Sequence, residues 1–292
     1  MFNEKRVQFY NLYSNYRNAF IKNDQLLRDL EFYITKLVND IILTNYEEIE
    51  YDYNEASYLN AFWANYPPDD RGRAPVGDQV PWIEVGEHSV GHKLSRLISE
   101  QYQIREIGLP SGADNRFVLY SEEIEKITAG YTNCAFVFLD IKSVGPRDNF
   151  NHTVISPYQV SGDGIWKNPN DNMENSPMKA QGQRASHVFY PAISPLYPLS
   201  DGKIAPTIHL FVKPVYRMLS NGYHGQPLES IKNICVPNGL LLTKSPNYLQ
   251  MYPSLFFPGK DDKGKDPRKI RVRVSFDILK RIDGWRVTEF KP

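Results

Sequence analysis

Asp140 and Lys142 are the two residues whose types and spacing most clearly predict chemistry. The apolar run at 135–139 is typical of a buried strand and leads directly into Asp140, so both side chains lie at the strand end and point to the same side. Two further acids, Glu87 and Asp114, precede them. Carboxylates bind Mg²⁺ or a similar hard cation, and a nearby ammonium stabilises the charge that develops when a phosphodiester is cleaved. An acid followed by acid-x-lysine is the pattern of metal-dependent nucleases.

A simpler interpretation of these residues requires no metal. In it, Asp140 and Lys142 pair with each other at the surface, and Glu87 only favours the start of a helix through the helix dipole. Glu87, however, lies about one helical turn before Gly91 and Leu94, so it is predicted to project toward the apolar side of that helix. A carboxylate directed at a core needs a cation or hydrogen-bond donors. The spacing alone leaves both interpretations open.

The elements that must position these residues are predicted from hydrophobic periodicity. Apolar residues recur at helical spacing over 24–50, with Asp24 as the expected N-cap, and a less regular helix is expected before it. The other predicted elements are helices over 82–100 and 122–128, and strands over 116–120, 204–218 and 231–244. Prolines in the last two strands favour sheet edges or bulges. Loops are expected over 65–81, 143–148 and 163–184.

This order of elements predicts the α/β class, with a mixed β-sheet flanked by helices and a smaller β subdomain. No internal repeat is visible, so a two-fold symmetric site would require two copies of the chain.

Composition excludes several classes of protein. Acidic and basic residues number 34 each, so any contact with DNA must come from local segregation of charge. Cys134 and Cys235 lie in apolar surroundings, which favours buried, reduced thiols over a disulfide framework or a metal cluster. The first residues lack the apolar stretch of a signal peptide, and no apolar run is long enough to cross a bilayer. We therefore expect a soluble cytoplasmic protein with no membrane partner.

A charged segment near the C-terminus, 259–276, has the pattern of a DNA-contacting hairpin. Polar and apolar residues alternate strictly from Arg271, which places Arg271 and Arg273 on one face, about 6.6 Å apart along the strand. A β-ribbon fits the major groove, where arginine recognises guanine and aspartate accepts a hydrogen bond from cytosine. Readout of G·C pairs is thus predicted for four residues: Lys260, Asp262, Arg271 and Arg273. The alternative is a solvated surface hairpin of mixed charge.

Six stretches of the chain resemble, in the same order, one enzyme family. They are DYNEA (52–56), PWIEVGE (81–87), REIGLP (105–110), DIKSVGPRD (140–148), VPNGL (236–240) and PGKDD (258–262). The family is that of type II restriction endonucleases within the PD-(D/E)xK nuclease superfamily. The resemblance implies a restriction-endonuclease-like fold with a β hairpin for DNA reading, in one domain over 1–292. Within it we expect N-terminal helices over 1–50, a catalytic core over 82–160 and a strand-rich DNA-recognition part over 200–292.

The resemblance also implies individual roles. The family's active-site acids fall on Glu87, Asp114 and Asp140, its lysine falls on Lys142, and the peptide oxygen of Ile141 would be a further metal ligand. One or two Mg²⁺ ions per active site are implied. The family's base-reading residues fall on Asp148, Lys260, Asp262, Arg271 and Arg273.

The implied activity is cleavage of double-stranded DNA at an interrupted palindrome, GCCNNNNNGGC or a close relative, leaving 3′ overhangs. Such enzymes are homodimers in the prokaryotic cytoplasm. A cognate DNA methyltransferase is expected in the same system, although not as a stable subunit.

The resemblance weakens in the first fifty residues, over 163–184 and over the hairpin tip 263–269. A changed contact there would alter the spacer or an outer base. Two rival functions remain open. A structure-selective repair nuclease would share the metal core but would need no paired base-reading residues, and an inactive DNA-binding protein would be expected to have lost an acid or the lysine.

Overall fold

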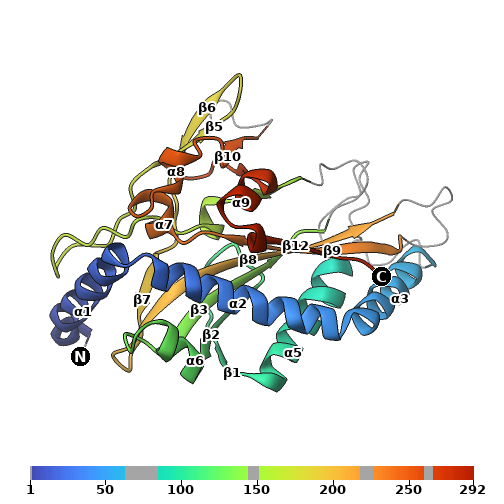
Figure 1. Ribbon diagram of the computed structural model, residues 1–292, viewed down its shortest axis with the longest axis horizontal. Coiled ribbons are helices and arrows are strands. Elements are labelled where there is room, and N and C mark those ends of the chain that lie inside the picture. Colours follow the sequence, from blue (N-terminus) through green and yellow to red (C-terminus); the bar gives the residue numbers. More distant parts are fainter. Residues whose placement is uncertain (1, 63–84, 144–150, 218–225, 260–265) are drawn as a thin grey trace.

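A mixed sheet forms the centre of the computed structural model, which describes residues 2–62, 85–143, 151–217, 226–259 and 266–292 (Figure 1). Within these residues the sheet has seven strands, in the order β1-β2-β3-β8-β9-β12, with β7 beside β8. The strands are β1 (Gln103–Glu106), β2 (Asn115–Tyr120), β3 (Cys134–Ile141), β7 (Leu196–Pro198), β8 (Ile204–Tyr216), β9 (Leu228–Val236) and β12 (Val287–Phe290). β3 and β8 run parallel, and the other neighbours run antiparallel. The predicted mixed sheet is confirmed.

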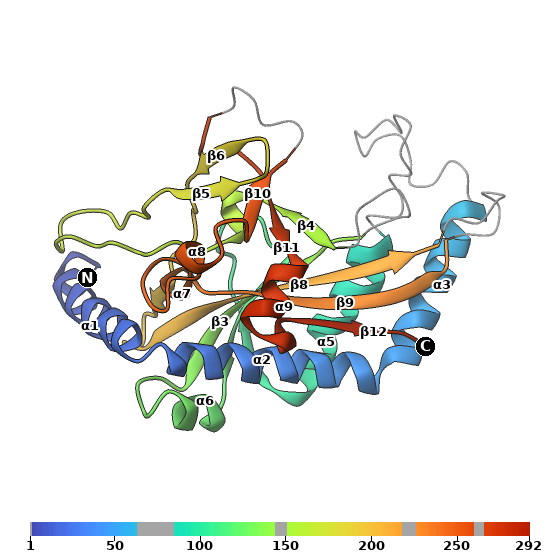
Figure 2. The same ribbon diagram turned by 45° about the horizontal axis from the view of Figure 1, so that its top comes forward.

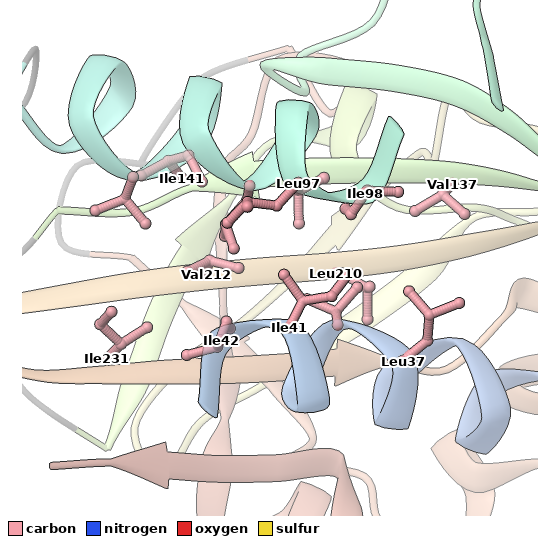
Figure 3. Packing of buried hydrophobic residues seen from close by; sticks show 14 of the residues in the cluster. Leu37, Ile41, Ile42, Leu97, Ile98, Val137, Ile141, Leu210, Val212 and Ile231 are labelled. Carbon is pink, nitrogen blue, oxygen red and sulfur yellow. The ribbon is translucent and has the colours of Figure 1, made fainter. Parts of the chain in front are cut away.

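The helices between residues 25 and 127 cover one face of this sheet, and most of the other helices in the described residues pack on the opposite side. The helices are α1 (Phe2–Lys22), α2 (Gln25–Thr44), α3 (Tyr46–Phe62), the π-helical turn η2 (Glu87–His92), α5 (Lys93–Gln101), α6 (Glu122–Ile127), η3 (Pro157–Gln159), α7 (Gly239–Thr243), α8 (Tyr248–Met251), α9 (Phe276–Ile282) and η5 (Gly284–Arg286). Figure 3 shows apolar side chains of α2 and α5 packed against β3, β8 and β9. None of the helices in the described residues is long and apolar enough to span a bilayer.

A second, smaller sheet lies over the opposite face. It contains β10 (Phe256–Pro258), β11 (Val272–Ser275) and β4 (His152–Ile155), in the order β10-β11-β4, and is called the small sheet below. A ribbon of β5 (Met178–Gln181) and β6 (Ser186–Phe189) packs beside it (Figure 2). The apolar side chains of the small sheet join those of β8 and β9 in one core. The loop expected over 163–184 is thus interrupted by a strand, β5.

The helix predicted over 24–50 is two helices. Asn45 separates α2 from α3, and its side chain donates to the carbonyl of Ile41 at 2.8 Å. Asp24 is the N-cap residue, as predicted, but it has helical backbone angles and makes no side-chain capping hydrogen bond.

The strand predicted over 231–244 is wrong in its second half. β9 ends at Val236, and Asn238 turns the chain into α7 by accepting a hydrogen bond from the Leu240 amide at 2.9 Å. The leucines that follow are buried on a helix. An apolar run of this length does not by itself distinguish a strand from a buried helix.

β8 lies at the centre of the sheet, although its prolines predict an edge or a bulge. Pro206 precedes the first residue paired with β3, Thr207, and Pro214 follows the last, Val212. On the β3 side both prolines therefore lie outside the paired stretch, where no amide donor is needed. A bulge at Val215 and Tyr216 interrupts the pairing with β9, as predicted.

A fully buried ion pair joins α2 to the C-terminal segment. Arg286 donates to Glu31 at 2.7 Å, and both side chains are inaccessible to solvent. Glu31 also accepts from the Asn238 amide at 2.5 Å, and Arg286 donates to Asp283 at 3.1 Å. The guanidinium lies 4.4 Å from the ring centroid of Trp285. Each charge is thus offset by hydrogen bonds that connect α2, α7 and η5. The two cysteines, as predicted, are free and buried.

We expect Glu31→Gln to destabilise the protein strongly. The substitution preserves shape but removes the buried carboxylate that faces Arg286, which costs up to about 3–5 kcal/mol in comparable sites; Asp283 remains as a weaker partner. Urea unfolding followed by circular dichroism measures the loss. Lys36→Ala, which removes the exposed Lys36–Asp40 pair of the same helix, is the control and should have a much smaller effect. Equal stabilities of wild type and Glu31→Gln would contradict the assigned role.

Candidate active site

Asp114 and Asp140 meet where β2 begins and β3 ends. Asp114 directly precedes β2, and the antiparallel register pairs Asn115 with Leu139. The Ile141 amide donates to Asp114 Oδ2 at 2.6 Å. Asp114 is exposed, whereas Asp140 is only 2% exposed. Antiparallel pairing thus brings together two acids that are distant in the sequence.

Asp140 is a buried carboxylate between two donors. Its Oδ1 accepts a hydrogen bond from Gln159 Nε2 at 2.6 Å, and its Oδ2 lies 2.6 Å from Lys142 Nζ. The predicted orientation of Asp140 and Lys142 toward the same side is confirmed. Burial raises the pKa of Asp140 to about 7, and the Asp114 charge adds to the increase, while Lys142 and the bond from Gln159 oppose it.

Gln159 is a site residue that the sequence reasoning missed. It ends the 3₁₀ turn η3, in which its Oε1 accepts from the Ser156 amide at 2.9 Å. Its Nε2 donates both to Asp140 and to the carbonyl of Gly112, at 2.7 Å. The spacing Ser-Pro-x-Gln is a capping-box pattern with proline at the first helical position, so the turn could have been predicted. Its contact with Asp140 could not, because it depends on the tertiary fold.

Glu87 lies on η2, which packs against the same strand end. A Cβ at Gly86 would lie 1.7 Å from Ser143 Oγ, and one at Gly91 would lie 2.8 Å from Ile141 Cγ1, so both glycines permit the close approach. Lys93, which begins α5, pairs with Glu48 at 2.8 Å and with Asp52, tying this helix to α3. Among the described residues, no three His, Cys, Asp or Glu side chains converge into a metal cluster. The role of Glu87 as a ligand therefore stays a prediction.

The carboxylate oxygens that do converge are suitable ligands for a hard divalent cation. Asp140 Oδ2 is buried and receives no hydrogen bond of good geometry, although Lys142 is near it, so this oxygen retains capacity for a ligand. The exposed Asp114 makes the position accessible from solvent. Mg²⁺ commonly takes one or two carboxylates and completes its shell with water and phosphate oxygens. Two aspartates with the Ile141 carbonyl beside them match that requirement.

The predicted DNA-reading residues lie partly in the small sheet. Arg273 on β11 is half-buried and lies opposite Val154 of β4, while its neighbours Val272 and Val274 are buried. Arg271, just before the strand, is exposed. The predicted alternation of faces is confirmed. Asp148, Lys260 and Asp262, together with the expected turn 144–148, lie outside the described residues.

Charges from both sheets surround His152, at the start of β4. Burial lowers the pKa of its imidazole to about 4, and Arg273 and Lys213 lower it further by electrostatic repulsion. His152 is thus neutral near pH 7. Lys213, on β8, is a second residue that the sequence reasoning missed.

Comparison with known proteins gives one consistent result. A family described as the type II restriction enzyme SfiI matches residues 26–290. The type II restriction enzyme BglI of Bacillus subtilis is 48% identical over 288 residues, which cover 97% of this chain and 96% of that protein.

Solved structures agree. The crystal structure of the restriction endonuclease BglI bound to its DNA recognition sequence matches with a TM-score of 0.92 and 46% identity, covering 100% of this chain and 99% of that one. Tetrameric SfiI bound to cognate DNA matches with a TM-score of 0.58 and 17% identity, covering 91% and 85%. The second match shows a shared fold.

The raised pKa of Asp140 predicts a pH-dependent effect of Asp140→Asn on stability in metal-free buffer. Between its unfolded value of 3.8 and its folded value of about 7, the folded protein binds the proton more tightly, so wild-type stability falls as pH rises through this range. The asparagine variant lacks this loss. Its stability relative to wild type should therefore increase from pH 4 to pH 7 and be constant above that, as measured by urea unfolding in EDTA. A difference that does not change with pH would contradict the prediction.

Proposed function

The chain belongs to the family of the type II restriction enzyme SfiI and is a DNA-cleaving type II restriction endonuclease; from this premise we propose that it is Mg²⁺-dependent and cuts at GCCNNNNNGGC or a close relative. Cleavage would leave 3′ overhangs and would be performed by a homodimer. The observation that supports this most strongly is the convergence of Asp114, Asp140 and Lys142 at one strand end, in a chain 48% identical to BglI.

Asp114, Asp140 and the carbonyl of Ile141 would hold the divalent cation, and Glu87 would bind a second one or orient the first. A bound Mg²⁺ polarises the scissile phosphate and lowers the pKa of a coordinated water. Asp140 must be ionised to act as a ligand, so metal binding is coupled to loss of its proton. Gln159 restricts Asp140 to one rotamer by donating to its Oδ1.

Lys142 would act in the transition state of phosphodiester cleavage. It lies at the strand end with a quarter of its side chain exposed, so its ammonium can reach a phosphate brought to the strand end. There it would stabilise the additional negative charge or position the attacking water.

The small sheet would supply sequence recognition. Arg273 on β11 and Arg271 just before it would each donate two hydrogen bonds to a guanine in the major groove. Asp148, Lys260 and Asp262 would complete the reading of each half-site. A palindromic site then requires two copies of the chain related by a two-fold axis.

The proposed assembly is a dimer, although SfiI is tetrameric in its complex. Analytical ultracentrifugation with cognate DNA would distinguish the two states. We also propose that a separate methyltransferase protects the host DNA at the same sites.

Digestion of sequenced plasmid and phage DNA with purified protein and Mg²⁺, followed by sequencing of every end, tests the proposed function. Discrete ends within GCCNNNNNGGC would support both the target and the overhang. Discrete ends at another sequence would refute the proposed target but retain the chemistry. Cleavage that follows DNA structure rather than sequence would indicate a repair nuclease, and binding without cleavage would indicate an inactive DNA-binding protein.

Asp140→Ala should reduce cleavage to background, because it removes a carboxylate that holds the metal. Binding to cognate DNA in Ca²⁺ should remain measurable by fluorescence anisotropy, since the small sheet is unchanged. Mg²⁺-dependent cutting by this variant would refute the assignment of the site.

Arg271→Ala should relax specificity at one base pair. Loss of a bidentate contact to guanine reduces discrimination by about 5- to 150-fold. Cleavage rates on cognate and singly substituted duplexes give the ratio. Arg268→Ala, at an exposed residue of the same segment, is the matched control and should leave the ratio unchanged. Unchanged discrimination in Arg271→Ala would exclude it from base reading.

A further inference from the structure

Lys213 is a buried lysine close to the proposed active site. It lies near the end of β8 and is 3% exposed. Its side chain is on the sheet face opposite α2 and α5, which is also the face from which Asp140 projects. The carbonyl of the preceding residue, Val212, accepts a hydrogen bond from the Lys142 amide at 2.8 Å. The two lysines are therefore side by side in the register of two parallel strands.

The ammonium of Lys213 contacts the small sheet. Its Nζ donates to the carbonyl of His152, the first residue of β4, at 2.6 Å. It also lies 5.4 Å from the ring centroid of Phe276, which directly follows β11. Figure 2 shows β11 and β4 on the same side of β8. One side chain thus connects β8 to β4 and to the residue that follows β11, the strand that carries Arg273.

The connection continues to the reading face. His152 is paired with Ser275, and Val154 is paired with Arg273, so His152 and Arg273 lie on the same face of the small sheet. If bound DNA displaced β11, β4 would move with it, because the two strands are paired. The shift of β4 would move Lys213, whose ammonium is bonded to the His152 carbonyl. Lys142 would be affected in turn, because its amide is bonded to the carbonyl of Val212, the neighbour of Lys213.

Burial of an ammonium is costly, and an apolar side chain of similar length would fill the same space without that cost. An ammonium differs in that it fixes geometry, because it must be directed at its acceptor. A hydrogen bond between two sheets restricts their relative position more than apolar packing does.

We propose that Lys213 is a positioning residue that couples base recognition by the small sheet to the alignment of Asp140 and Lys142. The proposal rests on the proposed function. Lys213 does not contact substrate in this role; it determines whether correct recognition results in cleavage.

The test compares Lys213→Met and Lys213→Arg with wild type. Affinity for cognate and singly mismatched duplexes is measured in Ca²⁺, and single-turnover cleavage of both is measured in Mg²⁺. For Lys213→Met we expect cognate cleavage to fall by about 100-fold, as for a small misalignment of reacting groups, while cognate affinity changes less than about threefold. Lys213→Arg, which retains a charged donor, should recover most of the rate.

Lys232→Met is the matched control. Lys232 lies opposite Lys213 on β9. It forms an ion pair at 3.8 Å with Glu289 on β12, within the seven-stranded sheet rather than between the two sheets. This variant should cut within about threefold of wild type. If Lys213 were purely structural, its substitution would lower DNA affinity and cleavage rate together, rather than lowering the cleavage rate alone.

Several results would overturn the proposal. They are wild-type rate and discrimination in Lys213→Met, a parallel loss of binding and cleavage, or no recovery in Lys213→Arg. If Lys213→Met does not fold, Lys213→Gln replaces it, and if neither neutral variant folds, Lys213 is a stability residue and the proposal fails. A wild-type protein that does not cut any DNA would instead refute the proposed function.

Discussion

The parallel pairing of β3 with β8 is the constraint on which the rest of the structure depends. Parallel neighbours require a long crossover connection. Here that connection, 142–203, includes β4, η3 and the ribbon of β5 and β6. It therefore contains both Gln159, which donates a hydrogen bond to Asp140, and His152, whose carbonyl accepts one from Lys213. The same pairing places the ends of β3 and β8 side by side, so Lys142, the proposed catalytic lysine, and Lys213, the proposed coupling lysine, are neighbours. The crossover thus supplies a residue that supports the proposed active site and the strand, β4, that pairs with the proposed reading strand β11.

Buried charges in this protein fall into two groups. Glu31 and Arg286 are inaccessible to solvent, and hydrogen bonds from three parts of the chain compensate their charges. This pair therefore has a structural role, connecting α2 to α7 and η5. Asp140 is almost as deeply buried, but one of its oxygens has no well-aligned donor and its pKa is raised to about 7. The fold thus tolerates an incompletely stabilised carboxylate at the position where a cation would complete its environment. Perturbed groups of this kind are concentrated at functional sites.

Local patterns in the sequence predicted what depends on neighbouring residues. The buried strand before Asp140, the alternation around Arg273 and the long helix after Asp24 are all encoded within short windows, and the strand and the alternation were confirmed. The break at Asn45 was missed because apolar residues recur at helical spacing on both sides of it, and the turn at Asn238 because the apolar residues before and after it were assigned to one strand. Gln159 and Lys213 could not be identified, because their partners lie 19 and 61 residues away in the sequence. The acids of the proposed site were predicted from their types and from the resemblance, whereas Gln159, which contacts Asp140, became visible only in the fold.

A zero net charge limits how this protein can bind DNA. Without an excess of cations, general attraction to phosphates is weak, and affinity must come from a few local contacts. Arg271 and Arg273, just before and on β11, are proposed to provide such contacts, and the neutral His152 allows Arg273 and Lys213 to approach without a third charge between them. Weak non-specific binding favours specificity, because the difference between correct and incorrect sites then depends on base contacts. An enzyme that cuts both strands of the host genome if it errs gains more from this arrangement than from a tighter general grip.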